Sequence, residues 1–178
     1  MNADAMPVRS LSSTLGVAEA RGAWAYDWSR PTAHVEDCTR GTPITNYNQQ
    51  IIEEFRANGG KVEGNFAGRP LLLLSTTGAK SGAERTTPLM FLPEGDAWYV
   101  FASMGGAPSN PAWYHNLVAH PDATIEVGAE RVPVRASVLD DRAKRDEVYA
   151  RQTALYPTFA DYETKTDRTI PVVRLTRA

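Results

Sequence analysis

The sequence predicts a mainly β protein with flanking helices, in which five or six short, mostly antiparallel strands form a small barrel or a packed meander. Strand-like runs recur along the chain at residues 70–77, 84–93, 97–103, 122–128, 131–138 and 169–176. Turn residues at 93–96 and 128–130 separate neighbouring runs. Pro133, inside one run, indicates an edge strand or a bulge. Only a few segments show helical periodicity.

The first helix is predicted just before the first strand. Four apolar side chains fall on one of its faces: Tyr47, Ile51, Ile52 and Phe55. Thr45 or Asn46 can cap its start. Gly59 and Gly60 end it, because glycine adopts the left-handed conformation without strain.

Two further helices interrupt the strands. One has Asn110 as its N-cap and Pro111 at its first helical position. The other covers about residues 141–156 and begins at Asp140 or Asp141. Its expected ion pairs, one turn apart, are Asp141–Arg145 and Glu147–Arg151.

Composition and charge narrow the function classes. The chain has 178 residues and a net charge of −2, which does not suit a general nucleic-acid surface. Cys38 is the only cysteine, and the three histidines follow no metal-ligand spacing. No run approaches the ~20 apolar residues of a membrane span, and the start lacks a secretory signal. The expectation is a cytoplasmic protein without a metal.

Residues 1–44 are predicted to be an N-terminal arm, and residues 45–178 a single folded domain. The arm is rich in small and polar residues, and its one apolar island contains Trp24, Tyr26 and Trp28. Such amphipathic rings are suited to any interface between an apolar surface and water. Docking on the protein's own body is the favoured interpretation; a partner subunit or peripheral membrane contact are the alternatives.

The strongest functional pattern is STTGAKSGAERTTP, residues 75–88, which follows four consecutive leucines. It is not a P-loop, because only Ala79 separates Gly78 from Lys80 and a strand follows. Gly78 and Gly82 permit a compact turn whose backbone N–H groups can converge on an anion. Lys80 adds a positive charge at the tip, and Arg85 returns on the next strand. The alternative is a solvated hairpin tip, and composition favours neither interpretation.

Two other segments combine loops with aromatic side chains. In ASMGGAPSNPAWYHN, residues 102–116, a strand ends at Ser103 and a Gly-Gly loop leads to a helix whose first N–H groups can bind an anion or a carbonyl. The alternative is a purely structural role, in which the helix packs on the barrel through Trp113. In residues 156–171, Tyr156, Phe159 and Tyr162 can form an aromatic wall, although spacing alone favours simple packing of a short helix.

These segments, taken in this order, resemble the deazaflavin-dependent nitroreductase family, actinobacterial split β-barrel reductases that use 8-hydroxy-5-deazaflavin (coenzyme F-420). The similar stretches are LLLLSTTGAKSGAERTTPLMFL, ASMGGAPSNPAWYHNLVAHPDATIEVG and ALYPTFADYETKTDRTIPVV, within residues 46–176. The resemblance implies an FMN-binding-like split β-barrel. It also implies hydride transfer from the reduced coenzyme to quinones or nitroaromatic compounds, with activated enones as further acceptors.

By this resemblance, the hairpin loop would hold the phosphate and glutamyl tail of the coenzyme, with Lys80 and Arg85 at its cationic positions. The expected cofactor-binding residues are Leu74, Ser75, Thr76, Thr77, Ala79, Lys80, Ser81, Gly82, Arg85, Thr87, Pro88, Ser103, Met104, Gly105, Ala112, Trp113, Tyr114 and Asn116. The expected substrate-binding residues are Met90, Phe159 and Tyr162. As the catalytic donor to the acceptor we expect Ser103, assisted by Tyr156 or Tyr162.

Four positions depart from the family pattern. Met90 and Phe159 replace tyrosines, Met104 replaces a lysine and Ala79 replaces an arginine. A less polar pocket should favour flat apolar quinones over bulky nitroimidazoles. Two alternatives stay open: an FMN-dependent split-barrel oxidoreductase, and a non-catalytic protein that binds a flavin or deazaflavin. A homodimer is also expected, because small barrels often pair through sheet surfaces.

Overall fold

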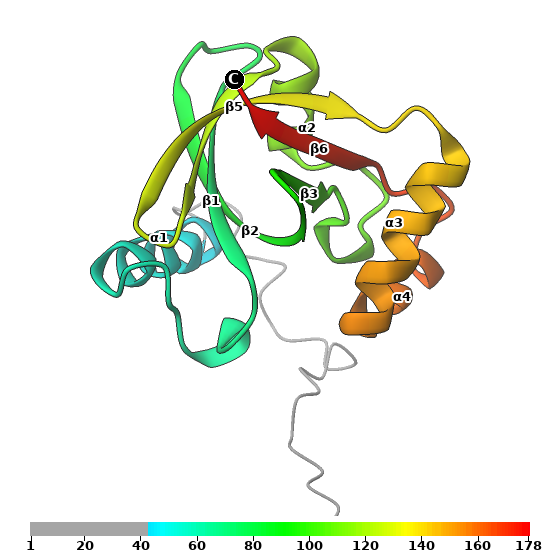
Figure 1. Ribbon diagram of the computed structural model, residues 1–178, viewed down its shortest axis with the longest axis horizontal. Helices are drawn as coiled ribbons and strands as arrows, with labels where there is room; N and C mark the ends of the chain where they lie inside the picture. The colour runs from blue at the N-terminus through cyan, green and yellow to red at the C-terminus, as the bar shows by residue number, and fades with distance from the viewer. Residues whose placement is uncertain (1–42) are drawn as a thin grey trace, which may run out of the picture. The chain divides into compact units, whose positions relative to one another are not determined.

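The computed structural model describes residues 43–178, whose six strands close into one antiparallel barrel in the order β1-β2-β3-β6-β5-β4 (Figure 1). The strands are β1 Leu71–Thr77, β2 Glu84–Glu94, β3 Ala97–Phe101, β4 Asp122–Val127, β5 Glu130–Val138 and β6 Val172–Arg177. The predicted mainly β class, with an antiparallel barrel and flanking helices, is confirmed. The predicted arm, with Trp24, Tyr26 and Trp28, lies outside the described residues except for its last two positions.

Short hairpins join neighbouring strands, as the turn residues predicted. Glu94 pairs with Ala97 across a turn in which Gly95 has φ 56. The β4–β5 turn has Gly128 at φ 59. Pro133 does not lie on an edge strand, because β5 is hydrogen-bonded between β4 and β6. Its carbonyl accepts from Ala178 N–H at 3.1 Å, beyond the end of β6, so its missing N–H removes no bond from that strand.

Four α-helices and two single 3-10 turns flank the barrel in the described chain. The helices are α1 Pro43–Ala57, α2 Ala112–Ala119, α3 Arg142–Leu155 and α4 Thr158–Thr164, and the turns are η1 Gly64–Phe66 and η2 Met104–Gly106. Figure 1 shows α1 at one side of the barrel and α3 with α4 at the other. Because α1 begins at Pro43, Thr45 and Asn46 lie inside it and are not its caps. It ends as predicted, with Gly60 N–H donating to the Phe55 carbonyl at 2.7 Å.

The four consecutive leucines of β1 are buried on both faces of the sheet. Leu72 and Leu74 point into the barrel interior, which they share with Phe91 and Ile125. Leu71 and Leu73 point outward, where the apolar face of α1 covers them. Burying each leucine contributes about 1.5–3 kcal/mol, so this strand is a rigid base for the turn that follows it.

Two details of the helices differ from the sequence-based expectation. Asn110 does not cap α2, which has Pro111 as its N-cap and starts at Ala112. Asp141 does cap α3, accepting from the Ala143 N–H at 2.9 Å. The ion pairs expected within α3 are absent from the described structure because both arginines have other partners. Arg145 pairs with its neighbour Asp146 and with Glu163 of α4, and Arg151 pairs with Glu94 of β2.

Candidate active site

Helix α2 connects the loop that follows β3 to the turn that follows β1. Strands β1 and β3 are both antiparallel to β2 and run in the same direction, but they are staggered. Val100 of β3 pairs with Phe91, and the preceding residue of β2, Met90, pairs with Leu71, so β3 ends level with the start of β1. From there the loop leads to α2, which contacts β1, and β6 begins opposite Phe101.

The turn between β1 and β2 is held by its own backbone. Gly78 N–H donates to the Ala83 carbonyl at 2.8 Å, and Gly82 N–H donates to the Gly78 carbonyl at 2.8 Å. Gly82 has φ +66, a conformation that glycine adopts without strain. Ala83 N–H donates to the Ser81 hydroxyl at 3.3 Å. The turn is therefore a fixed hairpin tip.

Asn116 ties α2 to this turn. Its Oδ1 accepts from the Ala79 N–H at 2.9 Å, and its Nδ2 donates to the Thr76 hydroxyl at 3.0 Å. The residue is only 8% exposed. Asn116 was predicted to bind the coenzyme, but its amide is already used to position the turn. Any effect of Asn116 on binding would act through Ala79 and Thr76.

These bonds narrow the predicted anion cradle. The N–H groups of residues 78, 79, 82 and 83 have partners inside the protein, so they do not converge on an anion. Within residues 43–178, the N–H groups of Lys80 and Ser81 have no hydrogen-bond acceptor. Lys80 and Arg85 are exposed, and no carboxylate of the described chain pairs with either. An anion at the tip would therefore meet two full positive charges and two N–H groups.

The predicted cofactor residues divide by exposure. The side chains of Leu74, Ser75, Thr76, Pro88, Ser103, Trp113 and Asn116 are buried, those of Thr87 and Tyr114 are half-buried, and residues Thr77, Ala79, Lys80, Ser81, Gly82, Arg85, Met104, Gly105 and Ala112 are exposed. Trp113 belongs to the barrel core, and the Ser75 hydroxyl is 2.8 Å from that of Thr86. The buried members can shape the site, whereas the exposed members can contact a ligand directly.

Arg168 holds the loop that follows β3. Its Nη2 donates to the carbonyls of Ala102 and Ser103 at 2.9 Å each, its Nε to the Ala107 carbonyl at 2.8 Å and its Nη1 to Asn110 Oδ1 at 2.6 Å. Burial lowers the pKa of Arg168, yet a guanidinium stays charged at neutral pH. Sequence reasoning missed this residue, because its partners lie 58 to 66 positions away.

Ser103 lies at the start of this loop. Its N–H donates to the Phe101 carbonyl at 2.8 Å, and its own carbonyl accepts from Arg168. The residue is 9% exposed, and its hydroxyl makes no hydrogen bond to another described residue. The hydroxyl is therefore free to donate to a ligand, and its catalytic role stays a prediction.

The tip of the same loop packs against α4. Met104 is 57% exposed with φ 48, while Gly106 is buried with φ 85. A Cβ on Gly106 would lie 2.9 Å from the Tyr162 carbonyl oxygen and 2.8 Å from Lys165 Cβ. The loop of Ser103 thus contacts the helix that carries two of the predicted aromatic residues.

The aromatic residues are more deeply packed than a substrate wall requires. Phe159 is 6% exposed, and its ring centroid lies 5.4 Å from Phe101 and 5.3 Å from Tyr162 in edge-to-face contacts. Tyr156 and Tyr162 are half-buried. Burial raises the pKa of Tyr162, so its phenol is neutral at physiological pH. Tyr156 and Tyr162 can reach an acceptor, whereas Phe159 mainly supports them from the core.

A cation that the sequence analysis did not single out lies beside these side chains. Arg69 Nη1 is 3.9 Å from Met90 Sδ, and Arg69 Cζ is 5.8 Å from the centre of the Tyr156 ring. The Arg69 charge also acts on Tyr162, where it opposes the rise in pKa caused by burial. Arg69 precedes β1 by two residues, and nothing in its sequence neighbourhood pointed to this placement.

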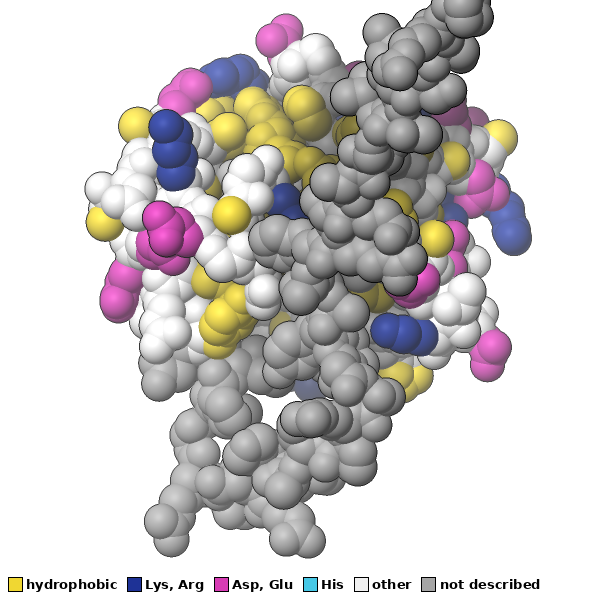
Figure 2. Space-filling model, turned by 90° about the horizontal axis from the view of Figure 1, so that it is seen from below, with side chains coloured by type: hydrophobic (Ala, Val, Ile, Leu, Met, Phe, Trp, Pro, Cys, Tyr) yellow, Lys and Arg dark blue, Asp and Glu magenta, His cyan; other side chains and the backbone are white. Residues whose placement is uncertain are grey.

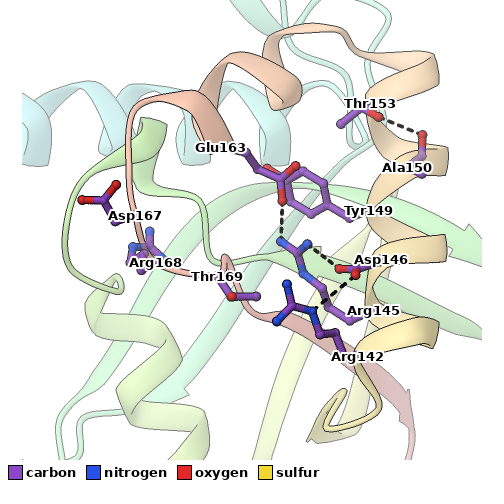
Figure 3. A pocket seen from close by; sticks show the side chains of 10 residues that line it. All are labelled: Arg142, Arg145, Asp146, Tyr149, Ala150, Thr153, Glu163, Asp167, Arg168 and Thr169. Atoms are coloured by element: carbon purple, nitrogen blue, oxygen red, sulfur yellow. Dashed lines mark hydrogen bonds and ion pairs between the residues drawn. The ribbon is translucent and has the colours of Figure 1, made fainter.

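A hollow of about 440 Å³ lies elsewhere, between α3 and residues 163–169 (Figure 3). Its charges are balanced, with three arginines and three carboxylates: Arg142, Arg145, Arg168, Asp146, Glu163 and Asp167. Arg145 Nη2 lies 2.9 Å from Glu163 Oε1, and its Cζ is 4.2 Å from the centre of the Tyr149 ring. A hollow lined by internal ion pairs does not provide the flat apolar slot that a deazaflavin ring needs. It contains none of the predicted site residues.

The surface carries mixed charge. Figure 2 shows acidic and basic side chains scattered over the lower face of Figure 1, around a group of apolar side chains. Among residues 43–178, no three His, Cys, Asp or Glu side chains gather so that they could hold a metal ion. None of the helices in this range is long and apolar enough to cross a membrane.

Comparison with known proteins assigns the family. The model of the F420H(2)-dependent quinone reductase family matches residues 47–177. A protein of Mycobacterium tuberculosis strain H37Rv named F420H(2)-dependent quinone reductase is 41% identical over 129 residues, which cover 69% of this chain and 85% of that protein. The protein of that name in strain CDC 1551 matches equally well.

Solved structures agree with this assignment. One described as an F420-H2 dependent reductase is 40% identical, has a TM-score of 0.55, and covers 60% of this chain and 94% of its own. Another, described as a domain-swapped dimer, is 35% identical, has a TM-score of 0.57, and covers 74% of this chain and 96% of its own. The chain therefore belongs to the F420H(2)-dependent quinone reductase family.

Proposed function

We propose that this protein takes hydride from reduced coenzyme F-420 and delivers it to a quinone. One observation carries the proposal: the family match over residues 47–177 includes the hairpin turn, the Ser103 loop and the aromatic segment together. Relatives at 41% identity bear the name of this activity. The exposed cations of the turn give the match a physical basis, because the coenzyme carries a phosphate and an acidic tail.

The chemistry of the described side chains suits the anionic end of the coenzyme. Lys80 and Arg85 are exposed and have no carboxylate partner within the described chain. The N–H groups of Lys80 and Ser81 can add two hydrogen bonds. When bound, the coenzyme supplies the hydride. Asn116 would keep the turn in its binding conformation, and Arg168 would keep the Ser103 hydroxyl in place.

The acceptor would lie beside the Ser103 loop and α4, which contact each other and can form one side of its site. Tyr156, Tyr162 and Met90 are half-buried there and can exclude water from one face of a flat ring. Their surfaces are mostly apolar, which favours a quinone over a bulky nitroimidazole. Nitroaromatic compounds and activated enones are secondary acceptors in this proposal.

Anaerobic oxidation of reduced F-420 in the presence of menadione tests the proposal directly. We expect stoichiometric loss of the reduced coenzyme with appearance of the hydroquinone, at a rate proportional to enzyme. Reduced FMN and NADPH are the comparison donors, and neither should support turnover at equal concentration. Tight binding of reduced F-420 without oxidation by any quinone would instead indicate a carrier. Faster turnover with reduced FMN would favour the flavin alternative.

The assembly state is a separate proposal. We infer a homodimer, supported by the relative at 35% identity that is described as a domain-swapped dimer. Light scattering of the purified full chain would decide it, since a molar mass of 19.5 kDa corresponds to the monomer. The cytoplasmic location and the peripheral membrane contact expected from the sequence stay predictions.

A further inference from the structure

Arg69 differs from the other half-buried or buried arginines in what surrounds it. Arg145 and Arg151 each pair with a carboxylate at 2.9 Å or less, and Arg168 donates to three backbone carbonyls and to Asn110 Oδ1. Arg69 is half-buried as well, but its neighbours are the thioether of Met90 and the ring of Tyr156. No carboxylate of residues 43–178 pairs with it. Among the described residues, no ion pair therefore balances its charge.

The backbone holds Arg69 firmly in this position. Its N–H donates to the Phe66 carbonyl at 3.0 Å, which closes the turn that follows η1. The next residue, Pro70, accepts from the Phe91 N–H at 3.3 Å, and Leu71 then pairs with Met90. The guanidinium is thus carried by the start of a buried strand beside Met90. Because the backbone is already ordered, only the freedom of the Arg69 side chain has to be lost when it binds a ligand.

The neighbours of Arg69 are those expected to contact the acceptor. Met90 and Tyr162 were predicted to bind it, and Tyr156 or Tyr162 to assist Ser103 as the donor to the acceptor. Quinone reduction creates negative charge on the acceptor: a hydride from the reduced coenzyme, which is one proton with two electrons, converts the neutral quinone to the hydroquinone monoanion. A proton from water or a phenol then yields the neutral hydroquinone. Arg69 is a cation that could stabilise the negative charge of this monoanion.

Resting on the function proposed above, we propose that Arg69 is a catalytic residue whose guanidinium donates hydrogen bonds to the acceptor oxygen that becomes negative. A preorganised donor in a partly dry site stabilises developing charge more than water does. The same cation selects acceptors that already carry an anionic substituent beside the reacting carbonyl. Lys80 and Arg85, by contrast, would act on the tail of the coenzyme.

The test compares Arg69→Met with the native enzyme on two quinones of similar ring size, menadione and 1,4-naphthoquinone-2-sulfonate. Removing a charged hydrogen bond at the transition state should lower kcat/KM for menadione roughly tenfold to hundredfold. The loss should be larger for the sulfonate, and Arg69→Lys should retain much of the preference for it. The dissociation constant of reduced F-420 should change less than about twofold. Arg142→Met, at an arginine whose side chain is 83% exposed, is the matched control and should behave as the native enzyme.

Each other outcome has a distinct meaning. Equal kcat/KM values for Arg69→Met and native enzyme on both quinones would overturn the role of Arg69 alone. A fall in kcat/KM that is matched by weaker coenzyme binding would assign Arg69 to the coenzyme and also overturn it. If Arg69→Met does not fold, Arg69→Gln is measured in its place and judged by the same ratios. Native enzyme that oxidises no reduced F-420 with either quinone would contradict the proposed function instead.

Discussion

Replacing Asn116 by alanine should both destabilise the protein and weaken its binding of reduced F-420. The substitution removes the bonds to the Ala79 N–H at 2.9 Å and to the Thr76 hydroxyl at 3.0 Å. Each contributes about 0.5–1.5 kcal/mol net, so the free energy of unfolding should fall by about 1–3 kcal/mol. Most of this loss should come from Thr76, which is 2% exposed and cannot regain water.

The effect on binding follows from the freed turn. Without Asn116, the backbone of the turn has to be ordered when the coenzyme binds. Ordering one residue costs about 1–2 kcal/mol, so the dissociation constant should rise about fivefold to thirtyfold above that of the native protein. Urea denaturation gives the first quantity and titration with reduced F-420 the second. Asn58→Ala, at an exposed position after α1, is the matched control and should change neither.

A double-mutant cycle separates the two bonds. Thr76→Val removes only the hydroxyl, and its coupling to Asn116→Ala should be about 1 kcal/mol, because the two residues share a hydrogen bond. A change below about 0.5 kcal/mol in stability for Asn116→Ala, together with an unchanged dissociation constant, would refute the reasoning.

Three further predictions concern the loop and the barrel. Arg168→Met should lower the free energy of unfolding by at least about 2 kcal/mol, and Arg168→Lys should recover less than half of it, because an ammonium cannot span the same carbonyls; urea denaturation measures both, and full recovery by lysine would contradict the role. Gly106→Ala should destabilise more than Gly105→Ala, since both have positive φ but only the former Cβ meets neighbouring atoms below 3 Å; equal melting temperatures would count against the contact with α4. The hydrogen bond from Arg56 lowers the pKa of Glu126, so this carboxylate contributes stability above the usual glutamate pKa that is lost as pH falls through the lowered value. The free energy of unfolding, measured from about pH 6 to pH 3, should therefore fall less steeply for Arg56→Met than for the native protein. Parallel plots of this free energy against pH would exclude the contribution of Glu126.

The fold was largely predictable because its determinants are local. Turn residues at positions 95 and 128, the buried leucine run of β1 and the cap at Asp141 act on neighbours a few residues away. The hairpins β1–β2, β2–β3 and β4–β5 follow from such local signals, whereas closure of the barrel also needs the long-range pairs β1–β4, β3–β6 and β5–β6. The start of α1 was less predictable, because nothing near Thr45 distinguishes a cap from an interior position.

The candidate site was only partly predictable because its contacts are long-range. The exposure of Lys80 and Arg85 follows from a hairpin tip, and the sequence indicated it. Asn116 reaches back 37 and 40 residues, and Arg168 reaches back 58 to 66. Asn110 resembled a helix cap, but its side chain accepts from Arg168 instead. Such pairings depend on how the strands close, which no local pattern encodes.

The affinity of Lys80→Ala for reduced F-420, measured at low and high salt, tests the central claim most directly. If the hairpin tip binds the anionic tail, the dissociation constant should rise, and it should depend less on salt than in the native protein because one charge contact is gone. Lys61→Ala, an exposed lysine outside the turn, should behave as the native protein. An unchanged dissociation constant and salt dependence in Lys80→Ala would contradict the account.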